Sequence, residues 1–198
     1  MTEPARQTAP YGAWPSPISS AMMTAGRVGL SEPRLDGADV YWCESRPWEK
    51  GRTVIVRRSA NGTIADVLPA GFDARDRVHE YGGGAYDVRD GVVVFSNRGD
   101  DRLYRIDDGG EPRPITGEGA WRYADLRIDA GRNRVVCVRE DHAAGGDAVN
   151  TLVAVSLAGE AEGGTILAEG ADFYSTPRLA PDGGRLAWLS WNHPNMPW

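Results

Sequence analysis

The residues best suited to chemistry lie in one glycine-rich stretch, Arg77 to Gly84, which reads RVHEYGGG. It combines the charges of Arg77 and Glu80 with the imidazole of His79, the phenol of Tyr81 and a run of glycines that frees the backbone. Glu80 or Arg77 could hold the amino or carboxyl terminus of a peptide through charge-assisted hydrogen bonds. Alternatively, the glycines permit close backbone passage while His79 and Glu80 satisfy neighbouring strands. We prefer the structural interpretation and keep both.

A second candidate stretch, Asn192 to Trp198, reads NHPNMPW. It combines the polar side chains of Asn192 and His193 with two prolines and Trp198. Proline stiffness could make it a rigid lip against another domain, or it could be a long bent connection between elements. We expect the residues of both stretches to bind a substrate or to form a domain interface.

Other polar clusters are weaker candidates for a metal or cofactor. Glu140-Asp141-His142 would point alternately on an extended chain, and no second cluster is spaced to complete a metal shell. A solvated loop or a salt bridge at a sheet edge is the preferred interpretation. Asp100-Asp101 and Asp107-Asp108 suit turns better than calcium. Neither a phosphate-binding P-loop nor G-x-G-x-x-G occurs, so we expect no metal and no cofactor.

The sequence also lacks the motif that carries a hydrolase nucleophile. The nucleophile elbow of an α/β-hydrolase needs G-x-S-x-G, because its Ser sits on a sharp turn where only small neighbours fit. The nearest match, Gly29-Leu30-Ser31-Glu32-Pro33, ends in proline and precedes an expected strand. We therefore predict no catalytic residue in this chain, and no hydrolysis by the chain alone.

Four copies of one hairpin pattern surround these candidates. The clearest, Thr176 to Trp191, has an extended run, a Pro-Asp-Gly-Gly turn and an apolar run too short for an ordinary helix. Looser copies occur at Arg34 to Trp42, Tyr86 to Phe95 and Leu126 to Val138. Their period of roughly 40 to 50 residues is typical of β-propeller blades.

The predicted fold class is all-β, a β-propeller of four-stranded antiparallel blades. We place the blades at about residues 31–69, 78–116, 122–170 and 173–198, the last one truncated. Residues 1–30 are expected to form an arm along a surface, with Tyr11 and Trp14 as apolar anchors; a flexible tail is the alternative. Propellers close with about four to eight blades. About three and a half blades cannot close, so we expect the front part of something longer.

Composition agrees with many short strands and limits the partners. The chain has 25 Gly, 13 Pro, 7 Trp and 7 Tyr, and we expect Trp42, Trp188 and Trp191 to pack between blades. Its net charge of -6, with the two signs interspersed, argues against nucleic acid or an anionic membrane as a partner. Cys43 and Cys137 are expected to be buried free thiols, which suits a reducing compartment. No apolar leader or membrane-length run occurs, so we predict a cytoplasmic location.

Four stretches together carry a resemblance to a known family. The sequence resembles the N-terminal propeller of bacterial prolyl-oligopeptidase-family serine peptidases, the branch described as dipeptidyl aminopeptidase or acylaminoacyl peptidase-like. The resemblance covers essentially the whole chain. The most particular stretches are HEYGGGAY and WNHPNMPW. The four are Thr8 to Ile18, Arg77 to Tyr86, Val138 to His142, and Leu189 to Trp198.

This resemblance implies a two-domain enzyme. A C-terminal α/β-hydrolase domain with a Ser, Asp, His triad would follow the propeller and is absent from this chain. The propeller would restrict access of short peptides to the hydrolase and line part of the site. The alternative is a stand-alone TolB-like propeller that binds partner proteins, and a third possibility is a sugar-processing propeller with carboxylates on its axis.

Overall fold

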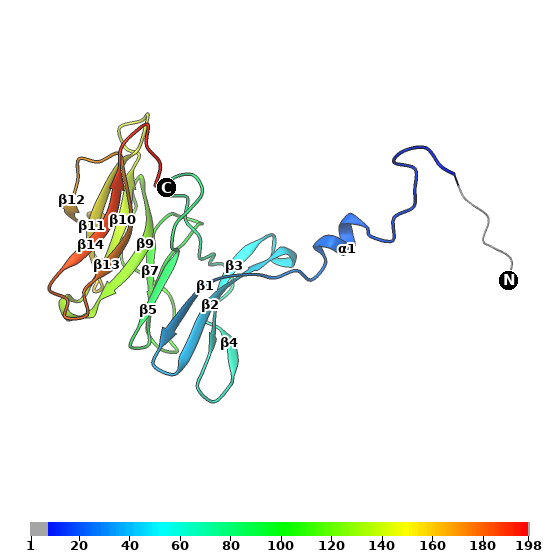
Figure 1. Ribbon diagram of the computed structural model, residues 1–198. Helices are drawn as coiled ribbons and strands as arrows, with labels where there is room; N and C mark the ends of the chain where they lie inside the picture. Colours follow the sequence, from blue (N-terminus) through cyan, green and yellow to red (C-terminus); the bar gives the residue numbers. More distant parts are fainter. Residues whose placement is uncertain (1–7, 198) are drawn as a thin grey trace.

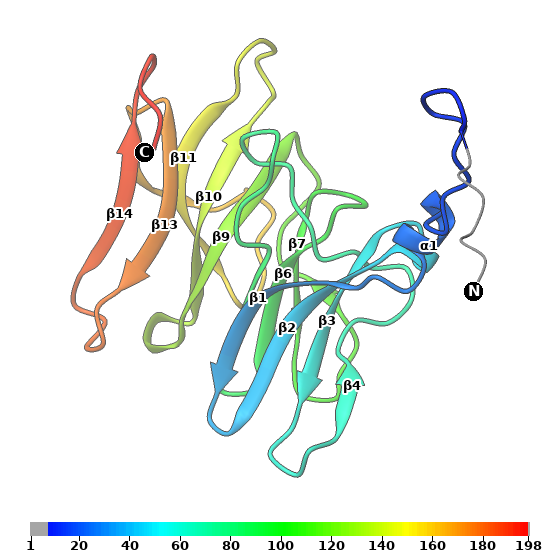
Figure 2. The same cartoon turned by 45° about the vertical axis from the view of Figure 1, so that its right-hand side comes forward.

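A computed structural model describes residues 8–197 of the 198-residue chain. These residues form three four-stranded antiparallel sheets and one two-stranded sheet, with neighbouring strands in chain order (Figures 1 and 2). The strands are β1 (Gly29–Asp36), β2 (Asp39–Arg46), β3 (Arg52–Arg58), β4 (Ile64–Asp66), β5 (Tyr86–Arg89), β6 (Val92–Ser96), β7 (Leu103–Ile106), β8 (Arg113–Pro114), β9 (Trp121–Asp129), β10 (Arg134–Asp141), β11 (Val149–Ser156), β12 (Thr165–Ala168), β13 (Phe173–Leu179) and β14 (Leu186–Trp191). The helical elements are α1 (Ser20–Thr24) and the 3-10 turns η1 (Pro47–Glu49) and η2 (Ala130–Arg132). The predicted all-β, incomplete propeller is confirmed.

The hairpin turns follow from residues that tolerate a left-handed backbone. Between β5 and β6, Asp90 has φ of 51° and Gly91 has φ of 76°. Two successive positive φ values give the two-residue turn whose twist matches that of the flanking strands. Asn133, with φ of 50°, has the corresponding place before β10. Short polar residues and glycine therefore set the hairpin register.

The hydrophobic core lies between neighbouring sheets. One cluster joins Tyr41 and Val56 of the first sheet to Tyr86 and Phe95 of the second. A second cluster joins the second sheet to the third, and a third cluster joins the third sheet to β13. Cys43 and Cys137 lie in the first two clusters as buried free thiols, as expected. Each blade is thus stabilised by its neighbours, as in a stacked array.

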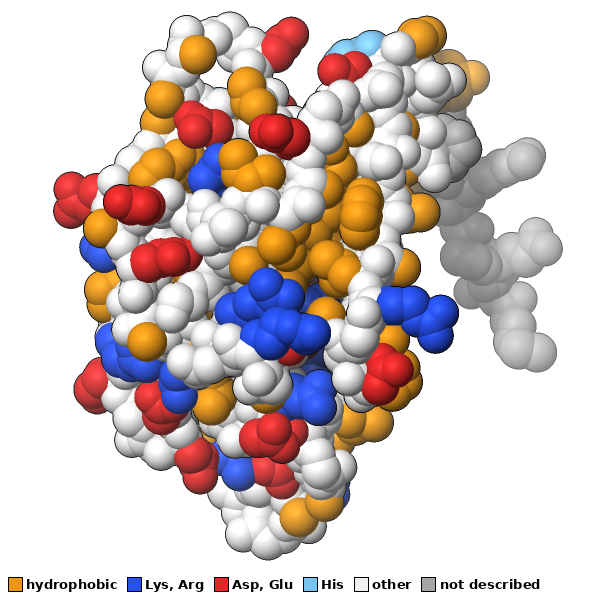
Figure 3. Space-filling model, turned by 90° about the vertical axis from the view of Figure 1, so that its left-hand side faces the viewer, with side chains coloured by type: hydrophobic (Ala, Val, Ile, Leu, Met, Phe, Trp, Pro, Cys, Tyr) orange, Lys and Arg blue, Asp and Glu red, His pale blue; other side chains and the backbone are white. Residues whose placement is uncertain are grey.

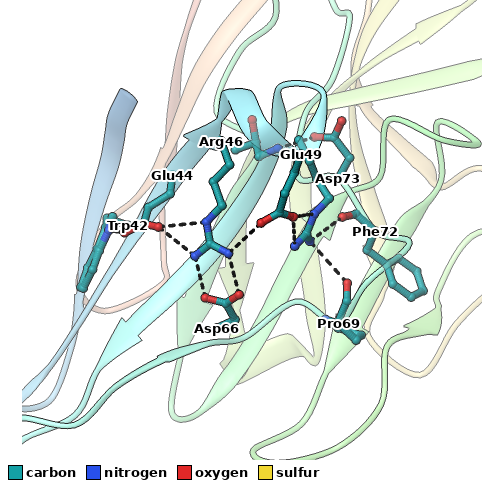
Figure 4. Close-up of polar contacts among 10 residues, drawn as sticks. Trp42, Glu44, Arg46, Glu49, Asp66, Pro69, Phe72 and Asp73 are labelled. Atoms are coloured by element: carbon teal, nitrogen blue, oxygen red, sulfur yellow. Dashed lines mark hydrogen bonds and ion pairs between the residues drawn. The ribbon is translucent and has the colours of Figure 1, made fainter. Parts of the chain in front are cut away.

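An ion-pair network fixes the corner from which the chain leaves the first blade (Figure 4). Arg46, at the end of β2, donates to the carboxylates of Glu44, Glu49 and Asp66. Arg52 donates to Glu49 and to the carbonyl oxygens of Pro69 and Phe72. These hydrogen bonds hold Pro69 and Phe72 in place, at the start of the segment that leads to the glycine-rich stretch.

The last sheet is the least covered part of the described chain. The second strands of the second and third blades, β6 and β10, are mostly buried, and β2 of the first blade is largely half-buried. Most of β14 is exposed, with Trp188 at 41% and Leu189 at 56%. Figure 3 views the molecule from the side of β12 and β14 and shows hydrophobic side chains gathered in a band on this face. The expectation that Trp188 packs between blades is wrong for the described residues, because the last sheet has a neighbouring blade on one side only and Trp188 stays exposed.

The N-terminal arm also departs from expectation. Residues 8–28 extend away from the sheets (Figures 1 and 2), and Tyr11 is fully exposed, with Trp14 at 53%. Neither is an apolar anchor. Between residues 8 and 28 the only regular element is α1, where the Ser19 hydroxyl accepts the backbone N–H of Met22 as an N-cap. None of the helices in the described range is long and apolar enough to cross a membrane.

Candidate functional site

A cleft of about 740 Å³ opens where loops from the second, third and fourth blades meet. The sequence has three histidines, and His79, His142 and His193 all line this cleft. They come from three different blades. The fold therefore gathers every imidazole of the chain at one place.

The glycine-rich loop reaches the cleft through an unusual backbone path. His79 and Glu80 have φ of 56° and 67°, which costs energy for residues with a side chain. Asp76 compensates, because its carboxylate accepts the backbone N–H groups of Val78 and Gly83 at 3.0 Å each. Burial raises the pKa of the Asp76 carboxyl to about 7. A Cβ on Gly83 would lie 3.0 Å from Ala124, so this position needs glycine.

Glu140 anchors the loop from the other side. Its side chain is buried, its Oε1 accepts the backbone N–H of His79 at 2.7 Å, and its Oε2 lies 3.1 Å from Nε2 of His142. Nη1 of Arg122 lies 3.9 Å from the same Oε2. The prediction of a solvated loop for Glu140 is wrong, because β10 continues through Asp141 and carries Glu140 into the interior. An ion pair at the blade end, the other part of that interpretation, is present.

Aromatic rings form one wall of the cleft. The His79 Nε2–H donates to the carbonyl oxygen of Tyr174 at 3.0 Å, which fixes the imidazole. The ring centroid of His79 then lies 5.4 Å from Phe173 and 5.7 Å from Trp191. Phe173 and Trp191 stack at 5.3 Å, and His193 meets Phe173 edge-on at 4.9 Å. Such edge-on and stacked pairs stabilise a flat apolar wall.

The segment after β14 is held against the chain that enters the last sheet. The Asn192 side-chain oxygen accepts the backbone N–H of Asp172 at 2.7 Å, and the Asp172 carboxylate accepts the N–H of His193 at 2.9 Å. Met196 continues the cleft wall. Trp198 lies outside the described residues, so its predicted role as part of a lip stays a prediction.

The predicted site residues divide into two groups. His79, Glu80, Tyr81 and His193 line the cleft, whereas Asn192 supports it from behind. The Arg77 guanidinium pairs with Asp101 and does not line the cleft. The side chain of Glu80 is 87% exposed and Tyr81 is 69% exposed, so a ligand can reach both, although Glu80 Oε1 also accepts from Arg122 at 3.3 Å.

Sequence reasoning missed several cleft residues. Arg122, which lies 3.3 Å from Glu80, and Phe173 were expected only as the starts of the third and fourth blades. Trp191 was assigned to packing between blades. Asp147 and Asp172 add carboxylates at the rim. Among residues 8–197, no group of three or more His, Cys, Asp and Glu side chains is arranged to hold a metal ion.

The cleft therefore combines an acidic rim with an aromatic wall. Glu80, Glu140, Asp147 and Asp172 supply carboxylates, and Arg122 is its one guanidinium among the described lining residues. Carboxylates bind ammonium groups by charge-assisted hydrogen bonds, and aromatic faces bind cations and apolar side chains. A small amine with an apolar substituent has the matching chemistry.

Similar proteins are found among solved structures, but not among family models or curated sequences. No protein-family model matches the sequence, and a search of curated proteins finds no match. Among solved structures, a puromycin-hydrolysing peptidase of Mycobacterium tuberculosis has a TM-score of 0.85 and 42% identity, covering 98% of this chain and 32% of that chain. Puromycin hydrolase has a TM-score of 0.86 and 37% identity, covering 98% of this chain and 32% of its own.

A mutant of puromycin hydrolase complexed with PGG is also similar, with a TM-score of 0.86 and 37% identity over 96% of this chain and 32% of that chain. The resemblance to prolyl-oligopeptidase-family peptidases is confirmed. The chain spans 32% of the length of these peptidases and matches their N-terminal domain.

Proposed function

We propose that this chain is the substrate-screening propeller portion of a serine exo- or oligopeptidase. In the intact protein a C-terminal α/β-hydrolase domain supplies the Ser, Asp and His. The observation that carries the proposal is the 42% identity to a puromycin-hydrolysing peptidase over 98% of this chain. By their names the similar proteins hydrolyse puromycin, and we extend hydrolysis of small amides of this kind to the intact protein.

The cleft gives the proposal a mechanism. Glu80 extends an exposed carboxylate, and Phe173 and Trp191 present stacked rings beside it. A short peptide would place its terminal ammonium at the carboxylates and its first side chain against the rings. Glu140 acts only through position, because its oxygens already hold His79 and His142. The propeller would thus admit and orient short peptides, while the hydrolase domain performs acylation.

The test uses the complete protein that contains this chain, with chromogenic amides of peptides of increasing length. Glu80→Gln and Tyr81→Ala should raise KM for the shortest peptides several-fold and leave kcat unchanged, because they alter binding and not the reacting groups. Glu111→Gln, an exposed carboxylate outside the cleft, is the matched control. Unchanged KM values in both cleft variants would remove the binding role from the cleft.

Two further assays separate the proposal from its rival. The 198-residue chain alone should not hydrolyse aminoacyl or dipeptidyl chromogenic amides, and turnover that survives rigorous purification would contradict this. A complete protein with no amidase activity, but with stable capture of another protein, would favour the stand-alone TolB-like propeller.

A further inference from the structure

Three arginines have equivalent positions on the first strands of the sheets. Counted back from each hairpin turn, Arg34 of β1, Arg127 of β9 and Arg178 of β13 face Tyr41, Val136 and Ala187 of the paired strands. In the second blade the same place is taken by Asp87, opposite Val94. The first strands are successive neighbours, since β1 packs beside β5, β5 beside β9 and β9 beside β13.

A repeated irregularity redirects these side chains. The ladder shifts register immediately before Arg34, Arg127 and Arg178, and β5 has no such shift. The bulged residues Glu32, Asp125 and Thr176 all have positive φ, at 51°, 58° and 49°. β-Bulges re-aim the side chains next to them.

The re-aimed guanidinium groups share one orientation. Nη1 of Arg34, Arg127 and Arg178 donates to the carbonyl oxygen of the residue before it, at 3.2, 2.6 and 2.9 Å. Arginines of three different blades thus hold their planar guanidinium groups, or forks, in the same way. Arg34 and Arg178 are both close enough to Arg127 to lower its pKa, so the three guanidinium groups lie near one another.

Three carboxylates lie beside these arginines, and each already accepts backbone N–H groups. The carboxylate of Asp125 accepts the N–H groups of Gly84 and Thr176, at 2.8 and 2.7 Å. Oδ1 of Asp87 lies 3.8 Å from Arg34 Nε and 3.7 Å from Arg127 Nη1, while its Oδ2 already accepts the N–H of Ile128 at 2.8 Å. Arg34 Nε is buried without a hydrogen-bond partner among the described residues. Within residues 8–197, Arg178 has no ion pair.

Another carboxylate, that of Glu32, is shared between an arginine and the backbone. It lies 3.5 Å from Arg34, and its oxygens also accept the N–H of Ala85. Burial lowers the pKa of Arg127, the positive charges of Arg178 and Arg34 lower it further, and Asp87 and Asp125 act in the opposite direction. Three guanidinium groups therefore lie close together, beside carboxylates that are already hydrogen-bonded.

We infer that Arg34, Arg127 and Arg178 form an anion site at the axis of the blades, which takes a carboxylate or a phosphate. The planar forks of arginine match both oxyanions, and their shared geometry leaves donors unpaired. The inference is independent of the proposed peptidase activity. In a peptidase, the carboxyl end of a bound peptide is one such anion, and free inorganic phosphate is the other source of this chemistry.

Isothermal titration calorimetry of the 198-residue chain at low salt tests the site. N-acetyl-triglycine should bind, and N-acetyl-triglycinamide, which lacks only the carboxylate, should bind at least tenfold more weakly; both lack the amine that would enter the cleft. Arg178→Gln should weaken binding of the acid roughly tenfold, since a charged hydrogen-bond donor is lost. Arg89→Gln, an exposed arginine at the end of β5, should change nothing.

Asp87→Asn supplies the reciprocal arm, because it removes the one acid shared by two of the arginines, and it should tighten binding of the acid. Titration with inorganic phosphate identifies the source of the anion: phosphate binding that depends on Arg178 without peptide binding supports a free-anion site. Equal binding of acid and amide with no binding of phosphate, or equal effects of Arg178→Gln and Arg89→Gln, would overturn the inference.

Discussion

Asp76, buried beneath the glycine-rich loop, makes the stability of this chain depend on pH. Desolvation by burial raises the pKa of its carboxyl to about 7, while the N–H groups of Gly83 and Val78 act in the opposite direction. In an unfolded chain the pKa of Asp is about 3.9. A difference of about three units corresponds to about 4 kcal/mol, since each unit is about 1.4 kcal/mol.

The sign follows from which state binds the extra proton. Between these two pKa values the folded chain holds a proton that the unfolded chain releases, so the free energy of unfolding falls as pH rises. The stabilisation is fully present below about pH 4 and is lost as pH rises through about 7. Between pH 5 and 8 the loss assigned to Asp76 is on the order of 2 to 3 kcal/mol.

Asp76→Asn keeps the size of the side chain and an oxygen that can accept from Val78 and Gly83, but it cannot titrate. Urea unfolding followed by tryptophan fluorescence at pH 5 and pH 8 gives the free energy of unfolding of each form. The free energy of unfolding should change between the two pH values by on the order of 2 to 3 kcal/mol less in the variant than in the wild type. Asp182→Asn, an exposed carboxylate in a turn, should follow the wild type. An Asp76→Asn protein that keeps the wild-type pH dependence would refute the reasoning.

Three further predictions concern other buried or exposed groups. Glu140→Ala should cost about 2 kcal/mol of unfolding free energy, because it leaves the His79 N–H unpaired in the interior, whereas the exposed Glu111→Ala should change stability by less than about 0.5 kcal/mol; equal costs in urea unfolding would contradict the anchoring role. Burial raises the pKa of the Cys43 and Cys137 thiols, so Ellman's reagent should label them slowly at pH 8 and rapidly in urea, and fast labelling without urea would disagree. The apolar β14 edge should make the chain self-associate, and Leu189→Lys should reduce this in sedimentation; a monodisperse wild-type monomer is the opposing result.

The repeat of short strands could be predicted because local chemistry encodes it. Turns such as Asp90-Gly91 need residues that accept positive φ, and apolar runs of strand length follow them. The outer strand of the second blade covers only Arg113–Pro114, next to Pro112, because proline cannot donate to a ladder. Local preference therefore predicts where strands occur better than where they end.

The site depended on contacts that local patterns do not contain. His79 and Glu140 are far apart in sequence, and their hydrogen bond exists only because the second and third blades pack together. The bulges before Arg34, Arg127 and Arg178 interrupt the alternation of side chains between the two faces of a regular strand, so the direction of these arginines could not be predicted from the sequence. The glycine-rich stretch could be recognised from the sequence, because its composition already indicates an unusual backbone.

The most direct test of the peptidase assignment is the DNA sequence downstream of the codon for Trp198. The account predicts that the reading frame continues through further strand repeats, which complete the ring, and then encodes a G-x-S-x-G motif between a predicted strand and a helix. A stop codon after a few more blades, with no such motif, would contradict it.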